Sequence, residues 1–454
     1  MKQKAPEIDQ LAGIEYYSTN FTGVGGEIKK NNNDFNVIEL IDKNFISQLT
    51  PRQEKNELFA IFKIEKNGID SNHAVILLKK RLGINFKIMG IKDAKASTLQ
   101  YASTAINSSS KRIDSKIRIG NIMLSFIGFS KKPLDKTMLI GNRFKINIRN
   151  INGNAKTEDL EPFCAQLDSI GNFYGLQRFG SERLVTHLVG KAILKKEFSK
   201  AVDILLTYTT KHDSTFSKEL REKLRDIKQN PNIVRKIPKG MDIERKIAEE
   251  IIKGKDPMYV LRSIPISIRR LFVQAFQAFI FNKTLSKSIE KKFSLINCET
   301  DDLCFEVTDN IVFGKIRKFD RINSDAMTEG PSMAKGVSDM TRKKNKGKEE
   351  RRFIPIIRLP GYAFQPGKSR FDIITKEVMQ EEGVTAKDFF IKELQELSES
   401  GGYRQAAYVC KDFKYDLASN NTSLRVEFAI PKGAYATTLL REIIKPDDPI
   451  AAGF

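Results

Sequence analysis

The chain has 454 residues, 40 % of them hydrophobic, which predicts two or three folded domains and excludes a disordered chain. Its formal net charge of +21 indicates a polyanionic partner such as nucleic acid, unless the source organism makes lysine-rich proteins in general. Four scattered cysteines and three histidines disfavour a His/Cys metal site and leave few candidates for a histidine base.

The N-terminal part of the chain is predicted to be rich in strands. It has no apolar segment typical of a signal peptide, and no apolar run in the sequence approaches the roughly 18 residues of a membrane span. We therefore expect a soluble, cytoplasmic protein without a membrane partner. Residues 24–41 predict a hairpin-like entry, with a turn at 31–34 before an alternating strand, and residues 58–64 predict another strand.

A helix and a functional loop are predicted next. Residues 71–82 have the apolar spacing of a helix that ends at Gly83. Residues 86–89 form a short apolar run, and residues 96–106 have helical character. Asp93 is thus expected at a strand–loop–helix junction, where the loop exposes a side chain and the flanking elements hold it.

The middle of the chain has a different periodicity. Residues 160–290 are dominated by helical spacing, and His187 is expected on the surface of one of these helices. Residues 320–352 are polar and irregular. They contain the basic run 342–348, which is either a solvated loop or a contact to an RNA backbone.

Alternating strands flank this helical middle. Residues 142–151 alternate apolar and polar side chains before it, and residues 424–430 do so after it, followed by a helix at 437–444. A strand-rich start, a helical middle and a strand-rich end predict one domain inserted into another.

Two glycine-rich segments are similar to phosphate-binding loops but lack the required context. Residues 23–26 have no buried strand before them and no helix after them. In residues 361–369 the required spacing would place the first glycine at Tyr362. Cys298 and Cys304 do not have the spacing of a zinc site. We therefore expect no nucleotide cofactor, no other cofactor and no metal.

Several segments combine polar side chains with aromatic rings. Such a mixture suits RNA, because arginine binds phosphates, amides read base edges, and rings stack on bases taken out of a helix. The segments are Lys66-Asn67, residues 91–95, residues 142–144 and residues 172–180.

These segments carry a resemblance to the TruD pseudouridine synthases. Residues 90–100 resemble the G-x-K-D signature of that family, and Lys29 lies five residues before Asp34, which begins a segment similar to the family's DFxVxE. Further resemblances follow in the family's order at Lys66-Asn67, 141–144, 172–180, 274–282, 359–362 and 432–437. Any one of these motifs is weak evidence, whereas eight in the right order are strong.

The resemblance implies an α+β fold. The family's catalytic domain has a mixed, mainly antiparallel sheet with flanking helices, and an inserted α/β TRUD domain forms the second wall of an RNA-binding cleft. On that basis we expect the catalytic domain at residues 1–157 and 381–454 and the insert at 158–380. The resemblance also implies an isomerase that converts uridine to pseudouridine in tRNA, at position 13, and we expect it to be a monomer.

The resemblance makes Asp93 the catalytic carboxylate, which either attacks the anomeric carbon or removes the 2′ proton of the ribose. Phe144 would stack on the flipped uracil, and Asn142 would form a hydrogen bond in the active site and order the catalytic loop. Lys29 would pair with the aspartate and favour its ionised form. The expected RNA contacts are Lys66, Asn67, Lys92, Gln177, Arg178 and Phe179, of which the last three could equally support the active-site loop.

Two other classes of function were weighed against this one. The intact Asp93 disfavours a catalytically silent RNA-binding protein on the same fold. A methyltransferase should show a glycine-rich cofactor loop after a strand, and a nuclease should show a cluster of acids for metal; the sequence has neither.

Overall fold

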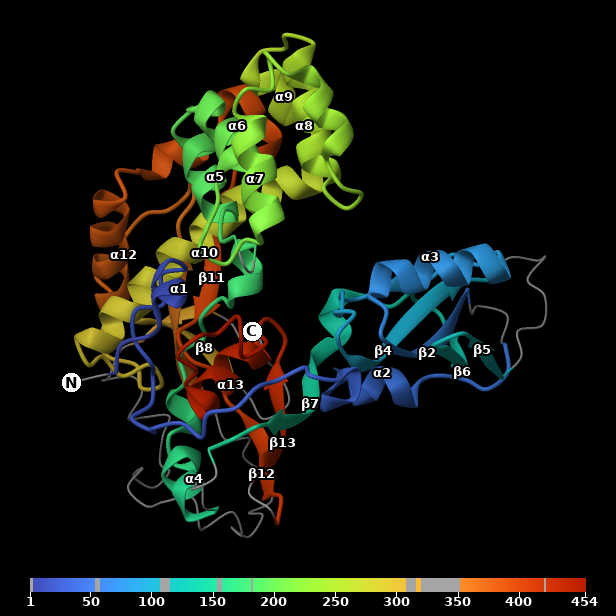
Figure 1. Cartoon of the computed structure of the whole chain (residues 1–454). Helices are drawn as coiled ribbons and strands as arrows, with labels where there is room; N and C mark the ends of the chain where they lie inside the picture. The colour runs from blue at the N-terminus through green and yellow to red at the C-terminus, as the bar shows by residue number, and fades with distance from the viewer. Residues whose placement is uncertain are drawn as a thin grey trace.

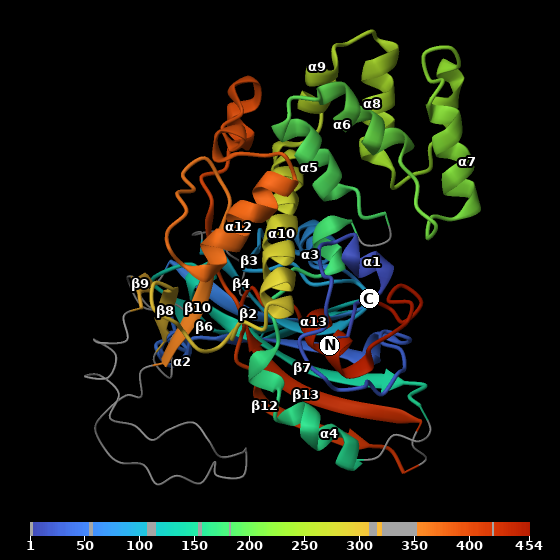
Figure 2. The ribbon, with the colours of Figure 1, turned by 90° about the vertical axis from the view of Figure 1, so that its left-hand side faces the viewer.

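The computed structural model describes residues 3–53, 58–106, 115–152, 157–180, 183–307, 316–319, 352–419 and 422–454. The basic run 342–348 lies outside these residues. Figure 1 shows a large sheet with its helices in the lower part of the molecule and a mainly helical unit above it. In Figure 2 the long helix α10 (Ile266–Glu290) rises from beside the large sheet into the helical unit.

The large sheet is mixed and mainly antiparallel, as predicted. In the described part of the chain it has nine strands, of which eight follow the order β12-β13-β7-β1-β4-β2-β6-β5, and β3 pairs with β4. Among the described strand pairs, only β1 and β4 run parallel to each other. The strands are β1 (Phe35–Ile41), β2 (Phe59–Asn67), β3 (Lys87–Ile88), β4 (Ser97–Ala105), β5 (Lys116–Ile119), β6 (Ile122–Ser130), β7 (Leu139–Arg149), β12 (Lys411–Leu417) and β13 (Ser423–Pro431).

Both faces of this sheet carry apolar cores, because successive side chains of a strand point to opposite faces. Phe62 and Ile64 of β2 pack with Leu78 of α3, whereas Ile61 packs on the α2 side with Ile41. A third core joins β1, β7 and β13 to α4 and α13. The helices on the sheet are α2 (Lys43–Ser47), α3 (Ser71–Leu82), α4 (Thr157–Cys164) and α13 (Ala436–Ile444).

The most periodic predictions are confirmed. Helix α3 begins after Asp70, whose carboxylate accepts hydrogen bonds from two backbone N–H groups of the first turn, and it ends at Gly83 with φ of +73°. The alternation at 142–151 is β7, the alternation at 424–430 is β13, and the last predicted helix is α13.

Two local predictions are wrong. Residues 24–41 do not form a hairpin, because Glu27 bridges to Arg149 of β7 while β1 pairs with β4 and β7. Residues 97–105 are the strand β4 and not a helix. Its buried side chains include Thr98 and Gln100, so polar residues hide the apolar alternation that would have indicated a strand.

The helical unit packs around α10. Its core includes apolar side chains of α5, α6, α8, α9 and α12. A four-stranded sheet, in the order β11-β10-β8-β9, lies beside it. The elements are α5 (Thr186–Leu194), α6 (Phe198–Thr207), α7 (Thr215–Leu224), α8 (Asp242–Ile252), α9 (Pro257–Arg262), α12 (Arg370–Glu381), β8 (Leu303–Val307), β9 (Ile316–Lys318), β10 (Arg352–Leu359) and β11 (Gly402–Gln405). No helix among the described residues has the length and apolarity that a bilayer crossing requires.

The limits of the inserted domain remain a prediction, and the packing suggests where they lie. Phe389 and Leu397 belong to the core of the helical unit, and β11 pairs with β10 through Gln405. The short N-terminal helix α1 (Glu7–Gln10) also packs on this unit, with Ile8 beside residues of α10. We propose that the insert ends near residue 405 and not near 380.

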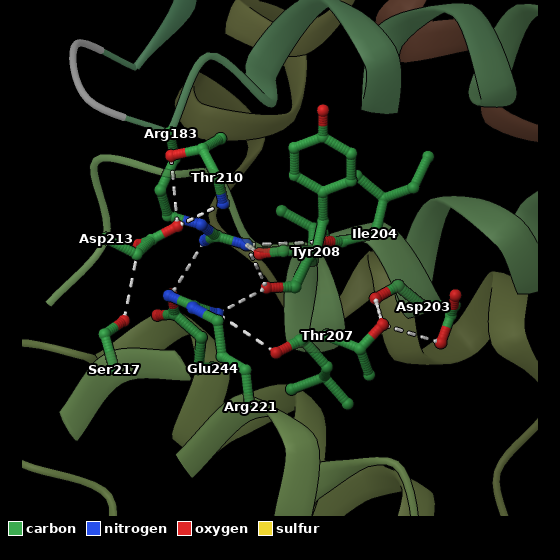
Figure 3. A network of polar contacts seen from close by, with 12 residues as sticks. Arg183, Asp203, Ile204, Thr207, Tyr208, Thr210, Asp213, Ser217, Arg221 and Glu244 are labelled. Carbon is green, nitrogen blue, oxygen red and sulfur yellow. Dashed lines mark hydrogen bonds and ion pairs between the residues drawn. The ribbon is translucent and has the colours of Figure 1, made fainter. Parts of the chain in front are cut away.

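A buried charge network holds the end of α6 in the helical unit (Figure 3). Glu244 of α8 accepts hydrogen bonds from Arg183 at 3.4 Å and from Arg221 at 3.0 Å. The two guanidinium groups also donate to carbonyls of the last turn of α6 and of Tyr208. The Ile204 carbonyl also accepts the backbone N–H of Tyr208 at 3.3 Å, and the arginines supply further donors to the carbonyls at this helix C-terminus.

The prediction for His187 is wrong. Its side chain is 4 % exposed and lies between the rings of Phe179 and Phe279. Burial lowers the pKa of His187 to about 3, so the imidazole is neutral at physiological pH. His187 is buried because α10 packs against the side of α5 that carries this histidine, which is a tertiary contact.

Candidate active site

The loop that carries Asp93 connects β3 to β4 and is bound to the start of α3. The backbone N–H of Lys92 donates to Oγ of Ser71 at 2.9 Å, and the N–H of Ser71 donates to the Lys92 carbonyl at 3.2 Å. Oγ of Ser71 also donates to Gln100 of β4 at 2.7 Å. Helix and strand together therefore fix the backbone on which Asp93 is presented.

Lys66 of β2 binds the same loop through its side chain. Its side chain is buried, and its ammonium donates to the carbonyls of Ile69, Lys92 and Asp93 at 2.6, 3.3 and 3.0 Å. An ammonium has three N–H donors, and here each has a backbone acceptor. Burial lowers the pKa of Lys66 to about 8, against the opposing effect of Asp70 and Asp93. The predicted RNA contact is thus a loop anchor in this structure.

Lys92 is anchored in a similar way. Its ammonium lies 2.9 Å from Oε1 of Glu39, and the other oxygen of Glu39 accepts the backbone N–H of Tyr101 at 2.9 Å. A side chain at Gly90 would place its Cβ 3.1 Å from the Lys92 ammonium, so glycine leaves room for this pair. Sequence reasoning did not assign Glu39 to the site, although it belongs to the DFxVxE segment.

Two donors from distant segments approach one oxygen of Asp93. Nζ of Lys29 lies 3.8 Å from Oδ2, and Nε2 of Gln177 donates to Oδ2 at 2.9 Å. The Lys29 side chain is 9 % exposed, whereas that of Asp93 is 52 % exposed at the rim of a pocket. Burial lowers the pKa of Lys29, and Asp93 opposes this effect.

Lys29 has an unusual backbone. Its φ is +58°, in the left-handed region that a residue with a side chain rarely adopts, and its ammonium lies 5.0 Å from the centre of the Phe35 ring. Strained backbone of this kind is typical of functional sites, because the surrounding structure must compensate its cost.

The pocket beside Asp93 has a volume of about 190 Å³, several times the roughly 30 Å³ of a water molecule. Phe144 forms part of its wall. One face of this ring stacks on Phe428, with the ring centres 5.4 Å apart, and Phe35 packs against Phe144 in a T-shaped arrangement. Asn142 also lines the pocket, and its buried Oδ1 has no hydrogen-bond partner among the described residues. Lys29, Asp93, Asn142 and Phe144 are therefore brought together, and Gln177 joins them.

The C-terminal part of the chain completes the pocket. Residues 434–437, at the start of α13, line the wall that includes Tyr435. Burial raises the pKa of Tyr435. Arg404 of β11 lies 5.8 Å from this ring and 4.0 Å from that of Tyr174. Sequence reasoning did not assign Tyr435 to the site, although it lies in the family-like segment 432–437, and no sequence signal indicated Arg404.

The remaining predicted RNA contacts lie in different surroundings. Phe179 is buried in a core with Ile8 and does not line the pocket. Arg178 is half-buried and donates to Gln274 of α10 at 3.3 Å. Asn67, at the end of β2, donates to Asn33 at 2.6 Å outside the pocket. No group of three or more His, Cys, Asp or Glu side chains in the described part of the chain could hold a metal ion.

Comparisons with known proteins assign the family. The family model described as tRNA pseudouridine synthase D (TruD) matches residues 11–443. The chain belongs to the TruD family. Two TruD relatives, from Methanosarcina mazei and Pyrobaculum islandicum, are each named "Probable tRNA pseudouridine synthase D". They are each 29 % identical to the chain and cover 97 % and 99 % of it, with 98 % and 100 % of their own lengths matched.

A solved TruD structure agrees with this assignment. The crystal structure from Methanosarcina mazei, assigned to tRNA pseudouridine synthase D, superposes with a TM-score of 0.75 at 28 % identity. The match covers 98 % of the present chain and 99 % of the M. mazei chain. The predicted α+β class and TruD fold are thereby confirmed.

Proposed function

We propose that this protein converts uridine 13 of tRNA to pseudouridine and that Asp93 is its catalytic carboxylate. As a member of the TruD family it is a tRNA pseudouridine synthase, an isomerase. The position in tRNA and the roles of the residues are our proposal. The main support for this proposal is the half-exposed Asp93 carboxylate, which lies at the rim of a pocket. Phe144 forms part of the pocket wall, and the buried side chain of Lys29 lies beside the carboxylate.

The reaction breaks the bond between N1 of uracil and C1′ of the ribose, turns the base, and forms a bond from C5 to C1′. The proton leaves C5 and N1 gains one, so that the product is an isomer. Asp93 either attacks C1′ or removes the 2′ proton, and both pathways need an ionised carboxylate beside the sugar. The ammonium of Lys29 places a positive charge 3.8 Å from Oδ2 of this carboxylate.

The target base must first leave the RNA stack, at a cost of about a few kcal/mol. Phe144 is positioned to compensate part of this cost by stacking on the base, since its ring forms the pocket wall. The unpartnered Oδ1 of Asn142 is an acceptor that suits an N–H group of uracil. We assign Lys66, Lys92 and Phe179 to the support of the site, because each is bound or packed inside the protein.

Asn67 and Arg178 remain candidates for RNA contact. The monomeric state stays a prediction. The cytoplasmic location stays a prediction.

The test is to incubate the protein with unmodified tRNA and to map pseudouridine at each position. Wild-type protein should modify uridine 13 alone, and a transcript with cytidine at position 13 should gain no pseudouridine. Asp93→Asn should be inactive, whereas the matched change at an exposed aspartate of the helical unit, Asp226→Asn, should be fully active. The proposal would be refuted if the wild type were inactive on every tRNA or if Asp93→Asn were fully active. If the wild type were inactive but still bound tRNA, a catalytically silent RNA-binding protein would be favoured.

A further inference from the structure

Gln177 reaches the catalytic carboxylate from outside the large sheet. Its amide lies 2.9 Å from Oδ2 of Asp93. A carboxylate only accepts hydrogen bonds, so the amide nitrogen must face it. Lys29 approaches the same oxygen at 3.8 Å. No hydrogen bond or ion pair joins Oδ1 of Asp93 to another described residue, and Asp93 lines the pocket.

The short turn that carries Gln177 is held on both sides. Leu176 and Phe179 are buried in one core with Ala275 and Ala278 of α10, and Gly180 ends the turn with φ of +97°. In this turn, Leu176–Phe179, Gln177 is the one exposed residue. Its backbone is therefore fixed by the packing of its neighbours, while its own side chain is free to project toward Asp93.

The chain just before this turn is bound to the helical unit as well. Arg404 of β11 donates to the carbonyl and to Oδ1 of Asn172 at 2.8 and 2.7 Å. Asn282 of α10 accepts the N–H of Tyr174 and donates to its carbonyl, at 2.9 and 3.0 Å. Gln177 thus takes its position from α10 and the small sheet, whereas Asp93 takes its position from the large sheet.

We propose that Gln177 is a positioning residue for the isomerisation: it holds Oδ2 of Asp93, so that Oδ1 is the oxygen presented to the ribose. This inference rests on the proposed function, because it requires Asp93 to be the reacting carboxylate. This role differs from a direct RNA contact. In such a contact the Gln177 amide would bind a base or a phosphate, and other residues would orient the Asp93 carboxylate.

Several charged groups surround Asp93, and they are unchanged when Gln177 is replaced by a neutral side chain. Lys29 comes from the segment before β1, Lys66 from β2, and Lys92 and Lys95 from the loop itself, with Asp70 at the start of α3. Loss of the amide donor removes a hydrogen bond that favours the ionised carboxylate, without a change in net charge. The rate should then depend on pH in a different way.

The experiment compares Gln177→Met with Gln229→Met, the same change at an exposed glutamine of the helical unit. Kinetic constants on unmodified tRNA are measured between pH 4.5 and 7.5, and thermal unfolding is recorded for each protein. Gln177→Met should lower kcat on the order of 10- to 100-fold, as expected for a lost hydrogen bond to a charged group, with KM within about twofold. The acid limb of its rate profile should move to higher pH, because the lost hydrogen bond went to the charged form. Gln229→Met should match the wild type.

A second variant separates the donor from the shape of the side chain. Gln177→Lys retains an N–H donor that can reach the carboxylate, so it should restore the acid limb to the wild-type position or below. An increase in KM with unchanged kcat would overturn the inference in favour of an RNA contact. A lower kcat without a move of the acid limb would also overturn it, because general loosening of the loop predicts that result. An inactive wild type would refute the proposed function itself, whereas an active wild type with an unaffected Gln177→Met would refute this inference alone.

Discussion

The ammonium of Lys92 lies 2.9 Å from the carboxylate of Glu39, a side chain with no solvent exposure. The residue next to Asp93, the proposed catalytic aspartate, is therefore anchored to β1, in the middle of the large sheet. Lys66 also donates hydrogen bonds to backbone carbonyls of the loop, and Gln177 donates one to the Asp93 carboxylate. The loop is therefore bound by three separate side chains.

Replacement of Glu39 by glutamine should weaken this anchor. The amide cannot neutralise the Lys92 ammonium, which then stays buried without a countercharge. We expect the free energy of unfolding to fall by about 2 kcal/mol, because the amide oxygen still accepts a hydrogen bond, and kcat to fall by about tenfold. Denaturant melts and kinetics on tRNA measure both quantities. Glu65→Gln, at an exposed position of β2, is the matched control, and equal behaviour of the two variants would contradict the prediction.

Lys66 should make stability depend on pH above neutrality. Its pKa in the folded protein is about 8, below the ordinary lysine value of 10.5. Between these values the unfolded chain binds more protons than the folded one, so the contribution of Lys66 to stability rises with pH in this window. We expect the free energy of unfolding of the wild type, relative to Lys66→Met, to increase by up to about 3 kcal/mol from pH 8 to 10.5. Urea melts across this range test it, with Lys63→Met on the same strand as control; a constant difference would count against the prediction.

Phe144→Leu should separate base stacking from core packing. Leucine fills much of the same volume but has no ring to stack on a base, and such stacking contributes about 1 to 3 kcal/mol. We expect kcat/KM to fall by about 10- to 100-fold. Phe428→Leu removes the ring behind Phe144 and serves as control. It should lower the melting temperature by a similar amount but change kcat/KM much less. Equal losses of kcat/KM in both variants would assign Phe144 to packing alone.

Glu244→Gln should destabilise the helical unit through the network of Figure 3. The change leaves the buried Arg221 and the largely buried Arg183 without their shared countercharge, and we expect a loss of about 2 to 4 kcal/mol in the free energy of unfolding. Glu222→Gln, in an exposed pair with Arg225, should cost less than about 0.5 kcal/mol. Denaturant melts distinguish the two, and a loss of equal size in both would show that burial of the network contributes nothing.

Regular local patterns were readable from the sequence. The helix α3, the strands β7 and β13 and the helix α13 each follow a strong period of apolar residues, which depends only on which face is buried. The strand β4 was misread because Thr98 and Gln100 are buried polar residues, and Gln100 is accepted in the core through its hydrogen bond with Ser71. His187 was misread because its burial depends on α10, far away in the sequence.

The sequence by itself determined the family resemblance, the residue types that RNA chemistry needs, and the loop that carries Asp93. Only the tertiary structure decided which side chains meet that carboxylate. Gln177 lies 84 positions from Asp93 in the sequence. Its Nε2 lies 2.9 Å from Oδ2 of Asp93 because each residue is fixed by a different core. No periodicity encodes such a contact, since it depends on how separate cores pack against each other and not on either segment alone.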